Sequence, residues 1–321
     1  MASMAGFATR SPGRQSPPAD DLLCYRQAEL STAAELQAFA DQHRTETGTW
    51  ARLRLSRGRV GLRFVDRSGS TLSAQELDER DDPELTVPPA VLLELEGRSN
   101  PFRLEVSFCC QSHRYFEKKH GLSQVHVDLL AAYQQHLQGQ GLGRVLDAGC
   151  GSGRNLLFLA KMGHAVTGLE NGREKLARIK AIARQEGLKD VTLVDHDLHQ
   201  RLPFAPSRFD MVIATVVLQF LRSERVDSLL GELSEATAAG GFHFLVFPVF
   251  SETFTLPQNF TFLPERDALF HWYQDRVWSL IDYQVSHGQL TRKDADGRPI
   301  QGLFAVLLAQ KPNLRSGAST R

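Results

Sequence analysis

The sequence lacks an excess of charge of either sign and has no long apolar run. Among its 321 residues, 37 Lys and Arg balance 37 Asp and Glu, so the formal net charge is zero. Nucleic acids and anionic membranes attract proteins with a basic excess, and we therefore expect neither as a partner. A membrane-spanning helix needs roughly 18 consecutive apolar residues. The longest candidate, residues 211–221, contains Thr215 and Gln219, so we expect a soluble, cytoplasmic protein.

Cysteine is scarce as well. Cys24, Cys109, Cys110 and Cys150 form no Cys-x-x-Cys pair, which excludes the usual zinc spacing and a disulfide framework. We expect free thiols in a reducing compartment and no metal site. Residues 1–20 lack the apolar stretch of a signal peptide and are expected, with residues 313–321, to be disordered tails. The same segment contains Arg10 and Arg14 and no acidic residue before Asp20, a composition that also resembles an organellar transit peptide.

Residues 21–110 contain short segments in which apolar and polar side chains alternate. The expected strands are residues 50–55, 60–65, 91–95 and 102–108. One helix is expected over residues 32–42. Several short strands at close spacing, separated by turn residues, predict a small β-sandwich-like domain or half-barrel. The region has no His cluster and no nucleophile motif, so its residues do not reveal its function.

Residues 111–312 show the alternation of strand and helix that is typical of a parallel sheet. The expected strands are residues 144–148, 164–169, 191–194, 209–217 and 242–247. The expected helices are residues 125–137, 154–162, 173–186 and 223–236. Two longer runs, residues 277–285 and 300–309, predict a terminal antiparallel hairpin with a loop at residues 288–299. The pattern predicts a Rossmann-like, doubly wound α/β sheet covered by helices on both faces.

A glycine-rich motif follows the first strand of this region. Gly149, Gly151 and Gly153 alternate with other residues directly after the strand, and a helix is expected to begin at Arg154. Such glycines allow a sharp turn and bring the backbone close to a ligand. A dinucleotide fingerprint would instead place its third glycine inside the helix. Asp147 before the glycines would repel a pyrophosphate but suits a cationic amino acid group, which favours S-adenosylmethionine over NAD.

Acidic residues follow three successive strands. Asp147 ends the first, Glu170 ends the second 23 residues later, and Asp197 follows the third. Each alone could be a solvated loop residue or a helix cap. The carboxyl ends of parallel strands meet at one edge of the sheet, where such folds bind ligands. We therefore expect Glu170 to accept hydrogen bonds from ribose hydroxyls and Asp197 to reach the adenine amino group.

The motif with its Arg154-Asn155 ending resembles the nucleotide-binding loop of class I methyltransferases. Three further segments resemble the TehB tellurite-resistance methyltransferases: residues 115–120 (YFEKKH), 215–221 (TVVLQFL) and 288–297 (GQLTRKDADG). This similarity extends over about residues 115–311. Some members of the family carry an amino-terminal β domain with Leu-Cys-Tyr and Gly-Thr-Trp motifs, and this sequence has both, at residues 23–25 and 48–50.

The resemblance implies that the protein transfers a methyl group from S-adenosylmethionine to tellurium or selenium oxyanions and contributes to tellurite resistance. Arg292 and Arg298 are then expected to bind the oxyanion, because arginine presents forked, cationic donors. The expected cofactor-binding residues are Tyr115, Asp147, Gly149, Gly151, Gly153, Arg154, Asn155, Glu170, Asp197, Thr215 and Val216. A small molecule or oxyanion is the expected substrate, and the chain could form a homodimer.

Two positions in the terminal hairpin depart from the family pattern. Thr291 stands where relatives often have His, and Pro299 stands where a second arginine usually follows the Asp-Gly turn. Three hypotheses therefore remain open. The protein is an oxyanion methyltransferase, a methyltransferase for another soft nucleophile or small metabolite, or a non-catalytic cofactor-binding sensor. All three hypotheses imply binding of the same cofactor, so only the pocket for the methyl acceptor can distinguish them.

Overall fold

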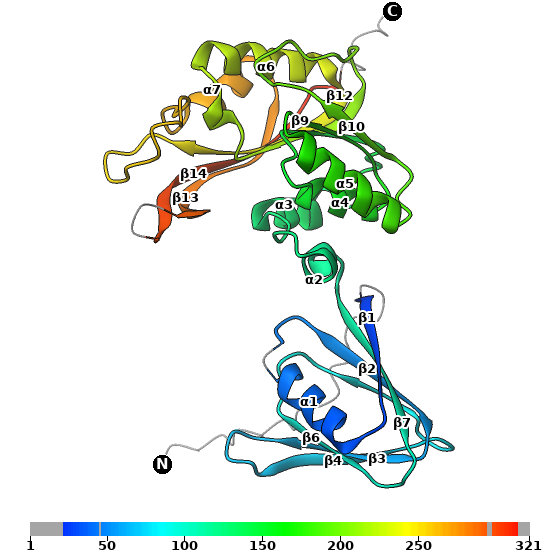
Figure 1. The fold of residues 1–321 in the computed structure, drawn as a ribbon. Coiled ribbons are helices and arrows are strands. Elements are labelled where there is room, and N and C mark those ends of the chain that lie inside the picture. Colours follow the sequence, from blue (N-terminus) through cyan, green and yellow to red (C-terminus); the bar gives the residue numbers. More distant parts are fainter. Residues whose placement is uncertain (1–21, 45, 294–296, 314–321) are drawn as a thin grey trace, which may run out of the picture. The chain divides into compact units, whose positions relative to one another are not determined.

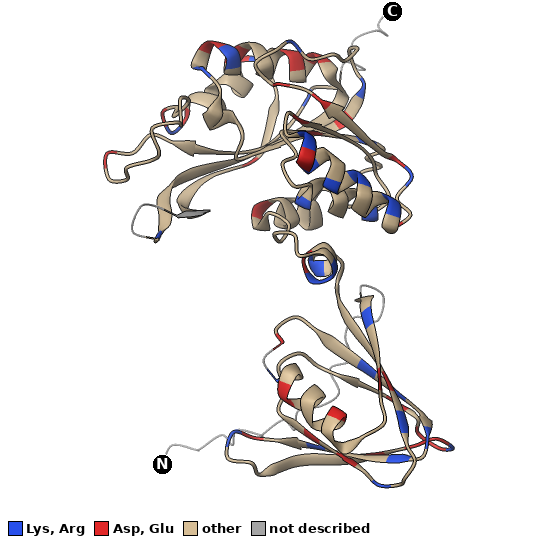
Figure 2. Ribbon diagram, viewed as in Figure 1, with Lys and Arg blue, Asp and Glu red and all other residues tan. Residues whose placement is uncertain are grey.

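The computed structural model describes residues 22–44, 46–293 and 297–313. The chain divides into two compact units, Met1–Gly121 and Leu122–Arg321. This division lies later than the boundary expected between residues 110 and 111, because helix α2 (Tyr115–His120) contacts the first unit's strands β1 (Leu22–Leu30) and β7 (Arg103–Gln111). The expected tails lie outside the described residues, apart from Asn313. Both units carry charges of both signs (Figure 2).

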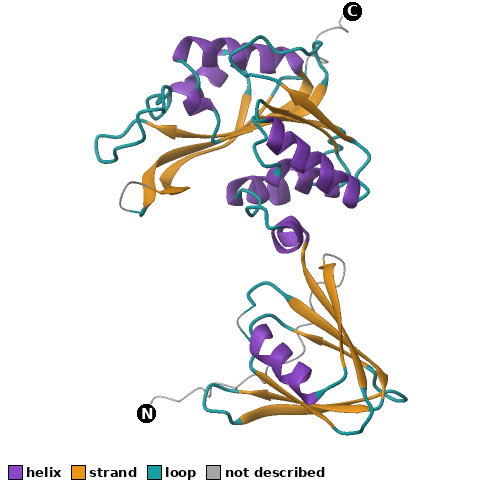
Figure 3. Cartoon of the chain, in the orientation of Figure 1, coloured by secondary structure: helices purple, strands orange, loops and turns teal. Residues whose placement is uncertain are grey.

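The first unit contains two antiparallel sheets and helix α1 (Ala33–His43), as Figure 3 shows. The four-stranded sheet has the order β1-β7-β2-β5, with β2 at Trp50–Arg57 and β5 at Glu84–Val87. The three-stranded sheet has the order β4-β3-β6, formed by Thr71–Asp78, Arg59–Val65 and Leu93–Gly97. The expected β-rich domain is thus confirmed.

Helix α1 is fixed at its start and along one face. Thr32 and Glu35 form a capping box that satisfies free backbone N–H groups at the helix start. Leu36 and Phe39 are buried in the same hydrophobic cluster as residues of both sheets, among them Leu62. The helix therefore completes the core of the first unit.

The second unit is built on a seven-stranded sheet with the order β10-β9-β8-β11-β12-β14-β13. The first five strands are mutually parallel, and the last two pair antiparallel. The parallel strands are β8 (Arg144–Ala148), β9 (Ala165–Glu170), β10 (Val191–Asp195), β11 (Phe209–Thr215) and β12 (Thr237–Val249). This arrangement confirms the expected class I methyltransferase-like α/β fold with antiparallel terminal strands.

Helices cover both faces of this sheet (Figure 1). Helices α3, α4 and α5 lie on one face, and α6 and α7 lie on the other. Their bounds are Val127–Ala132, Arg154–Lys161, Arg173–Gln185, Ser223–Ala236 and Ala268–Asp275. The segment expected as one helix over residues 125–137 is α3 followed by a π turn, Tyr133–Leu137. No helix in the described ranges is long and apolar enough to cross a membrane.

The strand order reverses between β8 and β11, which lie side by side although β9 and β10 come between them in sequence. In open α/β sheets the crevice at such a reversal, at the carboxyl ends of the strands, is the usual place for a ligand. The glycine motif follows β8 directly. The topology therefore brings the glycine loop to the position where a ligand-binding crevice is expected.

The terminal hairpin consists of β13 (Ser279–Lys293) and β14 (Pro299–Gln310), and it confirms the expected antiparallel pair. Strand β13 is much longer than the expected run over residues 277–285. The ladder continues through the pairs Gly288 with Gly302 and Gln289 with Gln301. The expectation that Arg292 lies in a hairpin loop is therefore wrong: its backbone belongs to β13. Backbone hydrogen bonds extend the strand through mostly polar residues. Apolar and polar side chains do not alternate there, so the sequence pattern did not indicate a strand.

Candidate cofactor and acceptor site

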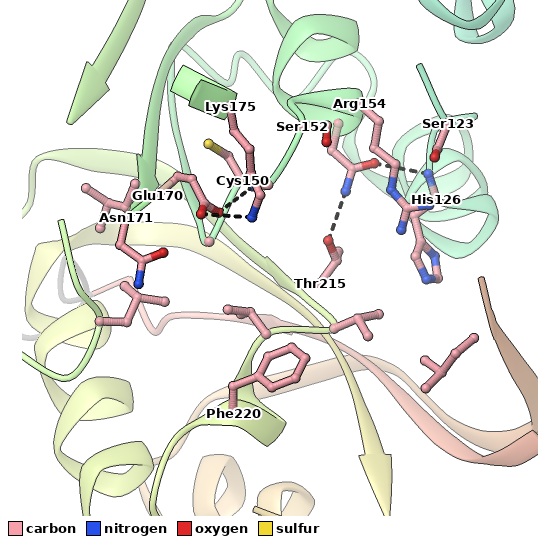
Figure 4. Close-up of a pocket in the computed structure, with 18 of the residues that line it drawn as sticks. Ser123, His126, Cys150, Ser152, Arg154, Glu170, Asn171, Lys175, Thr215 and Phe220 are labelled. Atoms are coloured by element: carbon pink, nitrogen blue, oxygen red, sulfur yellow. Dashed lines mark hydrogen bonds and ion pairs between the residues drawn. The ribbon is translucent and has the colours of Figure 1, made fainter. Parts of the chain in front are cut away.

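A cavity of about 830 Å³ opens in the second unit at the carboxyl edge of the sheet. Its walls come from the ends of β8, β9 and β11, from residues 123–127 before and at the start of α3, and from Gln289 and Leu290 of β13 (Figure 4). Sites for drug-sized ligands have volumes of roughly 300–1,000 Å³. The cavity is thus large enough for a nucleoside-containing cofactor.

The glycine loop forms one wall of this cavity. Gly149, Gly151 and Gly153 have φ angles of 77°, 56° and 84°, in the left-handed region that favours glycine. A Cβ atom on Gly149 would lie 2.4 Å from Val217 Cγ2, whereas a Cβ on Gly151 would meet no atom within 4 Å. Gly149 and Gly151 line the cavity. The open space beside Gly151 leaves room for a ligand to approach the backbone.

Gly153 has a different position from its two neighbours. It does not line the cavity but stands at the N-terminus of α4. A Cβ atom there would lie 2.7 Å from Ile179 Cγ1, on the neighbouring helix α5. The structure therefore explains this glycine by helix packing and by its backbone angle.

Glu170 holds the glycine loop from the end of β9. Its side chain is buried, and Oε2 accepts a hydrogen bond from the Gly151 amide at 3.1 Å. Oε1 accepts from the Gly172 amide at 2.9 Å and from Lys175 Nζ at 3.0 Å (Figure 4). A carboxylate has about four lone-pair positions, so acceptor capacity remains for a ligand hydroxyl. Glu170 lines the cavity, and its bond to ribose hydroxyls stays a prediction.

Asp197 also lines the cavity, from the segment after β10. Its Oδ1 atom accepts hydrogen bonds from the backbone N–H and Nδ1 of His199, both at 2.9 Å. These hydrogen bonds lower the pKa of the carboxyl group, which is therefore negatively charged at neutral pH. An acceptor for an amino group is thus available at this side of the cavity.

Asp147 does not lie on the cavity wall, unlike Glu170 and Asp197. Its side chain is 1% exposed, and neither carboxylate oxygen has a hydrogen-bond partner among the described residues. Burial raises the pKa of this carboxyl group to about 7, and the charge of Arg154 opposes part of that shift. Asp147 is thus buried away from the described cavity lining, and its role toward the cofactor stays a prediction. The residue ends a strand that is covered on both faces.

Asn155 connects three walls of the cavity. Its amide Nδ2 donates to Thr215 Oγ1 at 3.0 Å, and its Oδ1 accepts from the His126 backbone N–H at 3.0 Å. The neighbouring Arg154 donates from Nη1 to the Gln124 carbonyl at 3.4 Å. Figure 4 shows Arg154, His126 and Ser123 together on one side of the cavity, with Glu170 and Lys175 on the other.

Val216 adopts an unusual backbone conformation at the end of β11. Its φ angle is 55°, a left-handed value that is strained for a β-branched residue. Its N–H donates to the Val246 carbonyl at 2.7 Å, and its carbonyl accepts from Gln219 Nε2 at 2.9 Å. Both Thr215 and Val216 line the cavity. Strain of this kind concentrates at functional sites, which supports a binding role for this turn.

Three predicted site residues are not among the described residues that line the cavity. Tyr115 belongs to the first unit, where it is buried and accepts a hydrogen bond from Lys119 Nζ at 2.8 Å. Arg298 is exposed, next to the turn of the terminal hairpin. Arg292 follows Leu290, which lines the cavity, by two residues in β13, but its side chain lies outside what the structure describes. Their functional roles stay predictions.

Several cavity residues were not singled out from the sequence as site residues. They are Ser123, Gln124, His126, Asn171, Lys175, Phe220, Gln289 and Leu290. Lys175 had a usable signal, because it stands in the first turn of the helix after Glu170. Phe220 is 44% exposed and packs edge-to-face against Phe260, with ring centroids 5.3 Å apart. Gln289 and Leu290 lie in the segment 288–297 that carried the family resemblance, and Asn171 directly follows Glu170, whereas Ser123, Gln124 and His126 belong to no motif noted in the sequence.

Comparisons with known proteins place both parts of the chain in the same group. The family model described as tellurite resistance protein TehB matches residues 108–308, and that of the TehB-like domain matches residues 33–106. The probable S-adenosyl-L-methionine-dependent methyltransferase TehB of Haemophilus influenzae (strain 10810) is 28% identical over 296 residues, covering 91% of this chain and 99% of its own. Hemagglutinin 1 of Eikenella corrodens is 29% identical, with coverage of 85% and 87%.

A solved structure agrees with these matches. The crystal structure of TehB from Haemophilus influenzae superimposes with a TM-score of 0.82 at 26% identity, and covers 91% of this chain and 99% of its own. The similarity to this relative therefore extends over both units and over almost the whole length of the relative.

Proposed function

Because the chain belongs to the TehB family of S-adenosylmethionine-dependent methyltransferases, we propose that it methylates tellurium or selenium oxyanions and thereby contributes to tellurite resistance. The family and cofactor expected from the sequence are confirmed. The identity of the acceptor is our proposal, and it depends on the side of the cavity opposite Glu170.

The residues on the glycine-loop side fit the cofactor. Glu170 offers carboxylate lone pairs to ribose hydroxyls, and Asp197 offers an acceptor to the adenine amino group. The backbone of Gly149 and Gly151 can approach the ligand closely. When bound, the sulfonium supplies an activated methyl group that a lone pair can take directly. The protein's remaining tasks are to orient the acceptor and to exclude water.

The acceptor side carries the observation on which the proposal rests. Gln289 and Leu290 bring strand β13 into the cavity wall, two residues before Arg292. Arg154 lies on the same side of the cavity as His126. An oxyanion such as tellurite has a lone pair on its central atom and needs cationic donors rather than a general base. Arginine suits this task because its planar fork can contact two oxygens at once.

A methyl-transfer assay tests the proposal. Purified full-length protein is incubated with methyl-labelled S-adenosylmethionine and, in separate reactions, with tellurite, selenite, a small thiol or no acceptor. We expect S-adenosylhomocysteine to form with tellurite and selenite well above the reaction without acceptor. Tight cofactor binding without turnover of either oxyanion would contradict the proposal.

A small organic nucleophile is the second candidate acceptor. Phe220 is 44% exposed and lines the cavity together with Val217 and Leu290. An apolar wall of this kind suits a carbon-rich thiol or metabolite better than a small oxyanion. Turnover of the thiol alone in the same assay would favour this candidate, and cofactor binding without any turnover would favour a sensor.

A further inference from the structure

His126 lies on the same side of the cavity as Arg154, with its Nδ1 atom buried and no hydrogen bond to Nε2 among the described residues. The residue lines the cavity, and its side chain is 15% exposed. Its Nδ1 atom is buried without a hydrogen-bond partner among the described residues, and Asp128 Oδ2 is 3.5 Å away. The Asn155 side chain holds its backbone N–H. The residue is thus fixed at its backbone and has an acidic neighbour on its Nδ1 side.

The charges around His126 determine which nitrogen carries the proton. Burial and, to a smaller extent, the nearby Arg154 guanidinium on α4 together lower the pKa of the imidazole to about 4. The ring is therefore neutral at physiological pH. The carboxyl group of Asp128 on α3 favours the tautomer with its hydrogen on Nδ1. Burial and, to a smaller extent, Asp282 on β13 raise the pKa of Asp128.

Nε2 then has a free lone pair and no hydrogen to donate. A buried structural histidine normally has protein partners for both nitrogens, as His243 does with Thr237 and Tyr273. His126 differs from this pattern, because among the described residues Nε2 has no hydrogen-bond partner and Nδ1 has only the Asp128 carboxyl group 3.5 Å away. The free lone pair is complementary to a hydroxyl group and repels a bare oxygen anion.

We propose that His126 Nε2 accepts a hydrogen bond from the hydroxyl of a monoprotonated oxyanion, so that the site selects hydrogen tellurite or hydrogen selenite over the doubly charged form. This inference rests on the proposed function. The remaining oxygens carry the negative charge and suit the arginine donors. In the transfer, the lone pair of tellurium or selenium forms the bond to the methyl carbon, the carbon–sulfur bond breaks, and its electron pair stays on sulfur. The proton remains on the oxyanion oxygen.

The test compares two substitutions at His126 with a matched control. His126→Leu removes the acceptor, whereas His126→Gln keeps an acceptor oxygen near the position of Nε2. His136→Leu makes the same change in the following π turn, outside the cavity lining. Selenite is the acceptor, and production of S-adenosylhomocysteine is followed from neutral to mildly alkaline pH, where hydrogen selenite loses its proton. Circular dichroism and the affinity for S-adenosylhomocysteine report folding and cofactor binding.

We expect His126→Leu to raise the KM for selenite about tenfold, which corresponds to about 1.4 kcal/mol. Its affinity for S-adenosylhomocysteine should stay within twofold of wild type, and His126→Gln should recover most of the loss. The decline of kcat/KM on deprotonation of selenite should be steeper in wild type than in His126→Leu. Wild-type kinetics in both His126 variants, or a loss confined to cofactor affinity, would overturn the inference while the proposed function stands. Absence of selenite and tellurite turnover in wild type would overturn both.

Discussion

The Nδ2 atom of Asn155 donates a hydrogen bond to Thr215 Oγ1 at 3.0 Å and so joins the start of helix α4 to the end of strand β11. The other end of the same amide accepts from the His126 backbone, which belongs to a third segment. Asn155 is 2% exposed, so water cannot readily replace either partner. One buried side chain thus joins three segments that line the cavity.

We expect Asn155→Ala to destabilise the protein by about 2–3 kcal/mol, because the substitution leaves the part-buried His126 N–H and Thr215 hydroxyl without this partner. Urea unfolding at neutral pH measures the loss. The exposed Asn171→Ala, which also changes a cavity residue, should shift stability by less than about 0.5 kcal/mol. Equal stability of the Asn155 and Asn171 variants would show that the amide does not hold these segments together.

Glu170→Ala should weaken binding of S-adenosylhomocysteine by about 1.5–3 kcal/mol, the usual scale for hydrogen bonds to a charged group. The substitution also removes the acceptor for the Gly151 amide, which holds the glycine loop. Titration calorimetry measures the affinity, with Glu174→Ala in the exposed first turn of α5 as the control. Unchanged affinity of the Glu170 variant would mean that the ribose lies elsewhere.

The stability of the protein should depend on Asp147 between about pH 4 and pH 7. The pKa of this carboxyl rises from 3.8 to about 7 on burial. Within that window the native state holds a proton that the unfolded state has released, so stability falls as pH rises. Asp147→Asn cannot titrate. The stability of the variant relative to wild type should therefore increase from pH 5 to pH 7, by at most about 1.4 kcal/mol per pH unit.

Urea unfolding of wild type and Asp147→Asn at several pH values measures this difference in stability. An effect of the substituted side chain that does not depend on pH cancels, because only the change of the difference with pH is compared. Asp190→Asn, the same change at an exposed loop position, serves as the control. Parallel stability curves for Asp147→Asn and wild type would show that the carboxyl group titrates normally in the folded protein.

Arg292→Lys keeps the positive charge but loses the forked donors, so turnover of tellurite should fall by one to three decades, about 1.4–4 kcal/mol of transition-state stabilisation. Affinity for S-adenosylhomocysteine should hardly change. Arg292→Ala should be at least as harmful, and its combination with Arg298→Ala should be worse. Single-turnover assays at saturating cofactor measure these rates.

The matched control for this prediction is Arg276→Lys. Arg276 stacks on Trp272 at 4.0 Å and is not part of the cavity lining, so its conservative replacement should leave turnover unchanged. Full tellurite methylation by Arg292→Ala would remove the main support for an oxyanion acceptor and favour an organic one.

The sequence alone determined the central part of the fold. The strands that form β8, β9 and β11 are covered on both faces by helices, and such strands appear in sequence as short apolar runs. The strands that were not predicted, β1, β4 and β5, all lie at sheet edges. Most residues of β4 are exposed, so its sequence carries no alternation of apolar and polar residues. Edge strands are held chiefly by backbone hydrogen bonds, which leave little trace in side-chain pattern.

The sequence also determined the glycine-loop side of the site, because Gly149, Gly151 and Glu170 follow directly from their strands and the strand ends share one edge. Only the tertiary structure decided that Asp147 is buried away from the described cavity lining, that Val216 is strained, and that His126 lines the cavity. It alone brought Gln289 to the cavity wall, since the pairing of β13 with β14 controls how far that strand extends. Such contacts join residues far apart in the chain, and no local periodicity records them.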